Sequence, residues 1–165
     1  MVSFIMRYAR QAGYVIQPIT GKGVSTMDRE RLAEELKSDE GIVPHAYQDH
    51  LGYWTIGCGR LIDRRKGGGL SEDEIMYLLG NDIAKVHQQV RSALPWFDGL
   101  TDTRKRALCN MAFQMGINGL LGFKNTLALI QAGKYAEAAD NALKSKWAQQ
   151  TPARAKRVAD MIRKG

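Results

Sequence analysis

Cysteine, histidine and long apolar runs are scarce in this sequence of 165 residues. The two cysteines, Cys58 and Cys109, are too few for a disulfide scaffold, so we expect free buried thiols, although a single disulfide stays open. The three histidines form no paired ligand motif, which argues against a zinc amidase. No apolar run approaches the roughly 20 residues of a membrane-spanning helix, so stable membrane insertion is not expected.

The first 25 residues also lack the pattern of a signal peptide. Their apolar residues are interrupted by Arg7 and Arg10, and no small-residue cleavage site follows. An amphipathic helix packed on the domain is favoured over membrane attachment. We therefore expect residues 1–25 to be an N-terminal extension. The expected free cysteines are in keeping with synthesis in a reducing cytoplasm.

Positive charge is in excess, with 24 Lys and Arg against 17 Asp and Glu and a net charge of +7. Such a balance favours polyanionic partners, which include nucleic acid, an anionic membrane surface and a bacterial envelope, or it serves solubility alone. Because no nucleic-acid-binding motif is recognisable, we expect no nucleic-acid partner.

The order of predicted elements indicates a mainly helical α+β fold. Strand-forming residues gather between 46 and 62, where we expect a small antiparallel hairpin or three-stranded sheet. Helical patterns dominate the rest of the chain. The predicted parts are an extension (1–25), a small lobe (26–70), a connector helix (71–94) and a helical lobe (95–165).

Helix boundaries are marked by capping residues. Asp28 is suited to cap a helix that ends near Gly41, and the capping box Ser71–Glu74 precedes an apolar stripe that Pro95 closes. The segment 107–115 is apolar nearly all round, so we expect it to be the buried central helix. Further helices are expected at 123–132 and 134–146, and the last one should begin with Thr151 as its cap and Pro152 in its first turn.

Glu40 is placed where a carboxylate is unfavourable. It precedes the glycine stop of its helix, at the negative end of the helix dipole, which disfavours the ionised form and suits a proton donor. A tolerated surface charge is the plainer interpretation of this residue taken alone.

Asp49 and Thr55 follow at the predicted hairpin. Aspartate is common in turns and threonine in strands, so each is ordinary alone, but glycoside hydrolysis requires two carboxyl groups across a sugar-sized gap. By strand alternation, Thr55 should face a cleft while Trp54 and Ile56 face the core, and its hydroxyl would hold a water beside Asp49.

The spacing Glu40-x8-Asp49-x5-Thr55 resembles the catalytic triad of the phage T4-type lysozymes, glycoside hydrolase family 24. The similarity covers about residues 28–163. Its motifs are YQDHLGYWTIGCG at 47–59, NMAFQMG at 110–116, GFKNTL at 122–127 and QTPARAKR at 150–157.

The resemblance implies a lysozyme-like two-lobe fold and an N-acetylmuramidase that hydrolyses peptidoglycan. Glu40 would protonate the glycosidic oxygen, and Asp49 and Thr55 would position the attacking water. Arg154 matches a family arginine that pairs with the catalytic glutamate, and it would favour the charged carboxylate, which leaves the balance at Glu40 open. Gln114 would support the site, and the implied substrate contacts are Leu61, Phe113, Thr126 and Asn141.

Two departures from the family pattern affect the small lobe. Arg60 stands where the family commonly has a histidine, and we expect it to pair with Asp82 on the connector helix. The loop 61–70 is much shorter than in the T4 protein, which places saccharide contacts on that side in doubt.

Two other functions remain open beside hydrolysis: a lytic transglycosylase, and a wall-binding or virion structural protein without catalysis. The intact triad favours hydrolysis. We expect no cofactor and no metal, because acid–base chemistry by carboxyl groups needs neither. The expected protein is a monomeric endolysin, made in the host cytoplasm and acting on the wall after holin-type release to lyse the cell.

Overall fold

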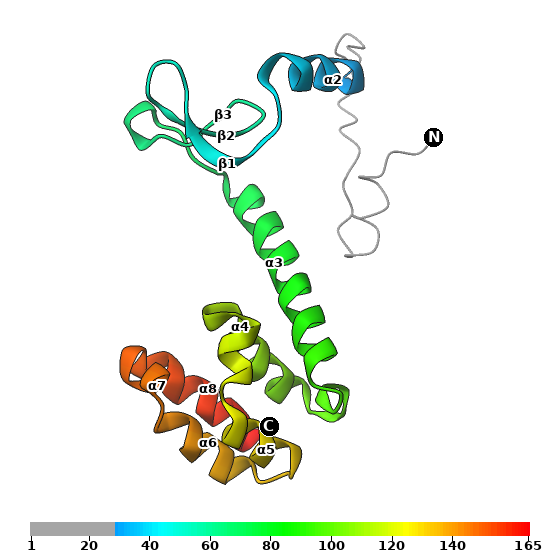
Figure 1. Ribbon diagram of the computed structural model, residues 1–165, viewed down its shortest axis with the longest axis vertical. Helices are drawn as coiled ribbons and strands as arrows, with labels where there is room; N and C mark the ends of the chain where they lie inside the picture. Colours follow the sequence, from blue (N-terminus) through cyan, green and yellow to red (C-terminus); the bar gives the residue numbers. More distant parts are fainter. Residues whose placement is uncertain (1–28) are drawn as a thin grey trace. The chain divides into compact units, whose positions relative to one another are not determined.

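The computed structural model describes residues 29–165 and has a mainly helical α+β fold, which confirms the predicted fold class (Figure 1). The chain divides into two compact units, Met1–Ile75 and Met76–Gly165. The expected extension at 1–25 and the expected cap Asp28 lie outside the described residues.

The first unit joins a helix to a small antiparallel sheet. Helix α2 spans Arg29–Glu40 and ends where Gly41 adopts a φ of 72°, with its N–H bonded to the carbonyl of Lys37. The sheet has the order β1-β2-β3, as the three-stranded alternative predicted, and a 3₁₀ turn follows it. The elements are β1 (Val43–Gln48), β2 (Trp54–Gly57), β3 (Arg60–Leu61) and η1 (Arg64–Lys66).

Helix α3, Glu72–Ala93, begins at the predicted capping box. The backbone N–H of Ser71 donates to the Glu74 carboxylate at 2.8 Å, and the Glu74 N–H donates back to the Ser71 hydroxyl at 3.3 Å. The bond from the Ser71 N–H is the largest cause that lowers the pKa of Glu74. Only the end of the expected apolar stripe is buried, since Val90 is inaccessible whereas Ile83 is half exposed.

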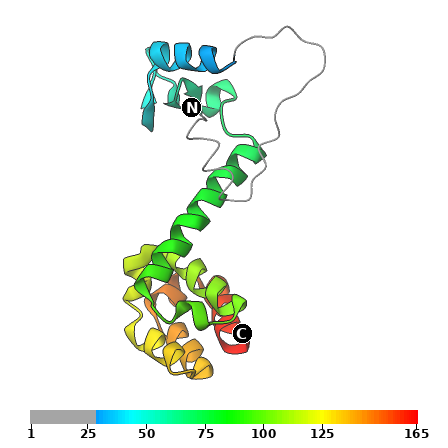
Figure 2. The same ribbon diagram turned by 90° about the vertical axis from the view of Figure 1, so that its right-hand side faces the viewer.

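The second unit holds the hydrophobic core, with helices α4 to α8 gathered into one cluster (Figure 2). Helix α4 is the expected central helix: Ala107, Leu108, Met111 and Ala112 are buried along it. Helix α8 packs against α4 and α6. The bounds are α4 Asp102–Leu121, α5 Lys124–Gln131, α6 Tyr135–Leu143, α7 Lys146–Gln150 and α8 Pro152–Lys164, with a 3₁₀ turn η2 at Phe97–Gly99.

One detail of the helical prediction is wrong. The segment 134–146 is not one helix, because α6 ends at Leu143 and Ser145 caps a separate α7. Thr151 is the N-cap residue of α8 and Pro152 begins the helix, as expected, while the Thr151 hydroxyl donates to the carbonyl of Trp147.

Both cysteines are free, as expected, but neither is fully buried. Cys109 is partly buried on α4, and this burial raises the pKa of its thiol. Cys58 is exposed on the turn after β2. No helix within residues 29–165 is long and apolar enough to cross a membrane.

Candidate active site

Glu40 is the last residue of α2, and the turn between β2 and β3 lies against its carboxyl group. A Cβ built on Gly59 would stand 3.0 Å from Glu40 Oε2, and Gly59 has a φ of +67°, which side chains rarely adopt. The neighbouring Cys58 thiol donates to the carbonyl of Leu36 in α2 at 3.4 Å. Gly59 therefore leaves the space that the Glu40 carboxyl occupies beside the sheet.

Asp49 is held by the turn that joins β1 to β2. Its Oδ1 accepts the backbone N–H groups of Leu51 at 2.9 Å and Tyr53 at 2.8 Å. The N–H of Gly52 donates to the Asp49 carbonyl, which closes the turn. Within residues 29–165, no hydrogen bond engages Oδ2, so this oxygen is available to a ligand or a water.

Thr55 lies in the middle of the central strand, where Tyr47 on β1 and Leu61 on β3 are its partners. It is buried, with 5% of its surface exposed, whereas Trp54 is 46% exposed. The expectation that Trp54 is a core residue is therefore wrong, because nearly half of its surface is exposed. That Thr55 faces a cleft stays a prediction. The hydroxyl of Thr55 donates to the carbonyl of Tyr53 at 3.2 Å, which leaves its oxygen lone pairs to accept another proton donor.

The backbone of Tyr53 joins Asp49 to Thr55. Its N–H donates to the Asp49 carboxylate, and its carbonyl accepts both the Asp49 N–H at 2.9 Å and the Thr55 hydroxyl. A carboxylate oxygen and a hydroxyl oxygen are thus fixed relative to each other by one residue. Such a pair is suited to accept the two protons of a water molecule.

Arg60 does not follow the sequence-based expectation. Its guanidinium pairs with Glu74 in the first turn of α3, not with Asp82 two turns later. The N–H and the hydroxyl of Ser71 donate to the Glu74 carboxylate and orient it at the start of the helix, where Arg60 binds it. This ion pair connects β3 to α3 within the first unit.

In the second unit, two predicted substrate-contact residues meet in one cavity of about 640 Å³. The hydroxyl of buried Thr126 donates to the side-chain oxygen of Asn141 at 2.8 Å, which links α5 to α6. Lys124 and Lys144 add positive charge to the same lining. The arrangement offers an amide and two ammonium groups to a polar or anionic ligand.

The other predicted residues of the second unit, which are Phe113, Gln114 and Arg154, do not line this cavity. Phe113 is 44% exposed on α4, where it is available for contact. Gln114 accepts the indole N–H of Trp147 at 2.8 Å, so it fastens α7 to α4. Arg154 donates to the side chain and the carbonyl of Asn110, at 2.8 and 3.2 Å. Its pairing with Glu40 in the other unit stays a prediction.

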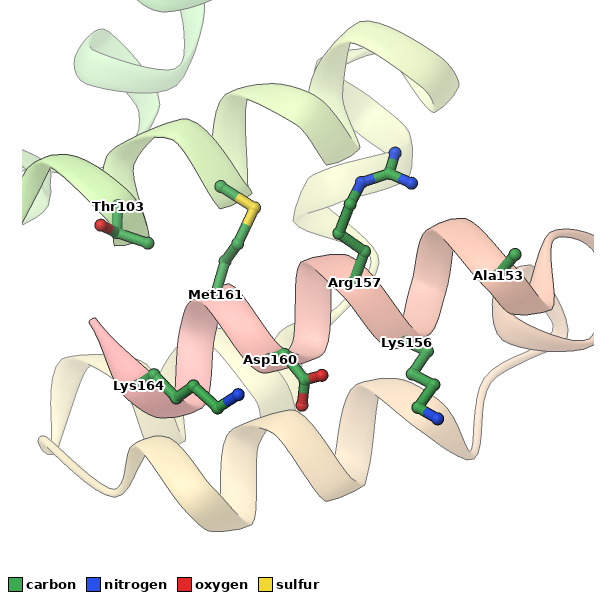
Figure 3. A pocket seen from close by; sticks show the side chains of 7 residues that line it. All are labelled: Thr103, Ala153, Lys156, Arg157, Asp160, Met161 and Lys164. Atoms are coloured by element: carbon green, nitrogen blue, oxygen red, sulfur yellow. The ribbon is translucent and has the colours of Figure 1, made fainter.

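A second cavity of about 460 Å³ lies along α8, and none of the predicted site residues lines it. Figure 3 shows Lys156, Arg157 and Lys164 extending from that helix, with Thr103 on the neighbouring α4. Within residues 29–165, no ion pair engages these three cations. All three cations lie on the exposed part of α8.

Sequence reasoning missed two residues of the first unit, Gly59 and Asp63. Gly59 was noted only within the motif at 47–59, and Asp63 only within the loop 61–70. Asp63 is 5% exposed and accepts bonds from the start of β2 and from the loop itself. An aspartate directly before a basic, glycine-rich segment is a capping signal that would have drawn attention to it.

Comparison with known proteins identifies the family. The family model described as Phage lysozyme matches residues 37–164. Probable T4-type lysozyme 1 of Dictyostelium discoideum is 33% identical over an alignment of 160 positions, and the match covers 81% of this chain and 94% of that protein.

Two phage proteins are also similar. The Pre-baseplate central spike protein Gp5 of Enterobacteria phage T4 is 31% identical over 81% of this chain, but the match spans 28% of that longer protein. A protein named Endolysin, from Acyrthosiphon pisum secondary endosymbiont phage 1, is 26% identical over 66% of this chain and 73% of its own length. The chain belongs to the phage lysozyme family.

Proposed function

We propose that this protein is an N-acetylmuramidase that hydrolyses the β-1,4 bond between N-acetylmuramic acid and N-acetylglucosamine in peptidoglycan. Membership of the lysozyme family makes it a glycosidase of the bacterial cell wall. The observation that carries the finer assignment is the placement of Glu40, Asp49 and Thr55 on three adjacent elements of one unit, with Asp49 and Thr55 bonded to the same residue.

In the proposed reaction, Glu40 donates its proton to the glycosidic oxygen as the bond to the anomeric carbon breaks. A water attacks that carbon and passes a proton to Asp49 Oδ2, while its other hydrogen bonds Thr55 Oγ1. The backbone N–H groups on Asp49 Oδ1 keep the carboxylate oriented while the opposite oxygen accepts the proton. The net change is the addition of one water across the bond, and the expected stereochemistry is inversion.

Substrate binding is proposed at Leu61, which pairs with Thr55 in the sheet, and at Phe113, Thr126 and Asn141. Arg154 and Gln114 are proposed as supporting residues. The chemistry requires only carboxyl groups and water, so the proposal includes no metal or cofactor.

The test is the mass of the products released from purified peptidoglycan. Hydrolysis leaves a reducing N-acetylmuramic acid end, heavier by one water than the anhydro product of a lytic transglycosylase. Anhydro products would overturn the assignment of Asp49 and Thr55. Binding to the wall without any released fragment would instead favour a structural role, a candidate that the similarity to a phage spike protein supports.

We also propose that the protein acts as an endolysin, which is made in the host cytoplasm and reaches the wall through a holin-type pore. Similarity to a phage protein named Endolysin supports this setting. Expression in host cells should cause lysis only when a pore-forming partner is expressed with it. Lysis without such a partner would contradict the proposed route.

A further inference from the structure

A buried carboxylate that the proposed reaction does not use lies beside the candidate site. Asp63 follows β3, and its side chain is 4% exposed. Its Oδ2 accepts the backbone N–H of Trp54 at 3.1 Å, and its Oδ1 accepts the backbone N–H of Arg65 at 2.9 Å. Since Trp54 immediately precedes Thr55, Asp63 is bonded to the peptide next to a proposed catalytic residue.

The backbone carbonyl of Trp54 is bonded by the segment around Asp63 as well. The N–H groups of Ile62 and Asp63 both donate to the Trp54 carbonyl, at 2.9 and 3.1 Å. Trp54 is therefore bonded through its N–H by the Asp63 side chain and through its carbonyl by the Asp63 backbone. These bonds from Ile62 and Asp63 fix the residue at which β2 begins.

Arg65 extends the contact to the turn that carries Asp49. Its guanidinium bonds both carboxylate oxygens of Asp63, at 2.9 and 2.6 Å, and donates to the carbonyl of Gly52 at 2.9 Å. The cations of Arg65 and Lys66 lie over the Tyr53 ring, 5.2 and 4.8 Å from its centroid. Gly52, Tyr53 and Trp54 are thus all contacted from the segment that Asp63 begins.

These three residues are the ones that lead from the Asp49 turn to Thr55. Because Asp49 and Thr55 are bonded through Tyr53, a movement of Tyr53 or Trp54 would change the separation of the two oxygens that hold the water. We propose that Asp63, oriented by Arg65, is a positioning residue that sets the geometry of the water-holding pair Asp49 and Thr55. This inference rests on the proposed hydrolytic function.

The ionisation of Asp63 suits such a role. The Arg65 side chain is the largest cause that holds the pKa of Asp63 well below its usual range, and the N–H groups of Trp54 and Arg65 act in the same direction. Asp63 therefore stays charged, and keeps all of its acceptor bonds, throughout neutral and mildly acidic conditions.

The experiment measures kcat and KM on soluble peptidoglycan fragments for the wild type, Asp63→Asn and Arg65→Gln. Asp63→Asn removes the ion pair with little change of shape. We expect kcat to fall by roughly tenfold to a hundredfold, since small displacements of a reacting group have effects of this size, while KM stays within about twofold. Arg65→Gln should give a smaller loss of the same kind, and Arg65→Lys should restore part of it.

The control is Asp140→Asn, which removes the ion pair between an exposed aspartate of the second unit and Arg163 and should leave kcat unchanged. All rates are divided by the folded fraction from circular dichroism. If Asp63→Asn does not fold, Arg65→Gln decides the question, because the Arg65 side chain is 64% exposed and its loss leaves the carboxylate in place.

Normal kcat per folded molecule in both Asp63→Asn and Arg65→Gln would overturn the proposal, as would a rise in KM without a fall in kcat. Failure of the proposed function has a different signature, because the wild type itself would then release no hydrolysed fragments.

Discussion

The two units of the protein are stabilised in different ways. Among the described residues, every buried apolar side chain belongs to the second unit, while the buried side chains of the first unit are the polar Thr55 and Asp63. The balance of charge also differs between the two units. The second unit carries 14 Lys and Arg against 6 Asp and Glu, and the first unit carries 10 against 11.

The difference shows that the candidate catalytic residues are held by directed polar contacts. Hydrogen bonds fix Asp49, Thr55 and Asp63, and a glycine leaves space for Glu40. Hydrogen bonds specify position well but each adds little net stability, whereas a packed apolar core supplies most of the free energy of folding. Substitutions should therefore affect stability most in the second unit and activity most in the first.

The largest expected effect is on the core of the second unit. Leu108 is 1% exposed on α4, so Leu108→Ala should lower the free energy of unfolding by about 2–5 kcal/mol through lost burial and the cavity left behind. In the first unit Leu70 is 42% exposed, and Leu70→Ala should cost about 0.5 kcal/mol or less. Urea unfolding measures both changes. Equal losses would show that the two units do not differ in this way.

The next effect concerns the space beside Glu40. Gly59→Ala would place a methyl group 3.0 Å from Glu40 Oε2, and we expect the rate of wall hydrolysis to fall by roughly tenfold to a hundredfold. Gly133→Ala is the matched control, because Gly133 has a similar φ of +74° but nothing within 4 Å of the added atom. Both variants should lose similar stability from backbone strain. An equal loss of activity in the two would refute the role of Gly59.

The smallest expected effect is on the pH dependence of stability, through Glu74 at the start of α3. The pKa of Glu74 is lowered in the folded protein, mainly by bonds from Ser71. The ionised carboxylate therefore stabilises the fold above pH 4.5, the ordinary pKa of this group. This stabilisation is lost as the pH falls through the lowered pKa of the folded state. Glu74→Gln should be slightly less stable than the wild type at pH 7. Thermal unfolding of the two proteins should converge in acid. A difference that persists unchanged at low pH would contradict this assignment.

Local sequence signals predicted the boundaries of these elements well. Gly41 ends α2 directly after Glu40, and the Ser71–Glu74 capping box begins α3. Both features depend on residues within one turn of each other, which is why sequence alone indicated them. The spacing of Glu40, Asp49 and Thr55 was likewise a local pattern.

Contacts between residues far apart in the sequence were missed. The alternation rule gave Thr55 and Trp54 opposite faces but not which of the two is covered, because that depends on what packs against each face of the sheet. Glu40 meets Gly59 only after the sheet forms. Arg60 pairs with Glu74 because the capping box presents that carboxylate first, which the family comparison with Asp82 did not indicate.

The most direct test of this division of roles is the rate at which Glu40→Gln clears outer-membrane-permeabilised cells, measured with the melting midpoint of the same sample. Glu34→Gln, which alters another exposed glutamate of α2, is the control. We expect Glu40→Gln to lose roughly a hundredfold or more of the wild-type rate at an unchanged melting midpoint, while Glu34→Gln retains that rate. Clearing by Glu40→Gln at the wild-type rate would show that Glu40 is not the proton donor.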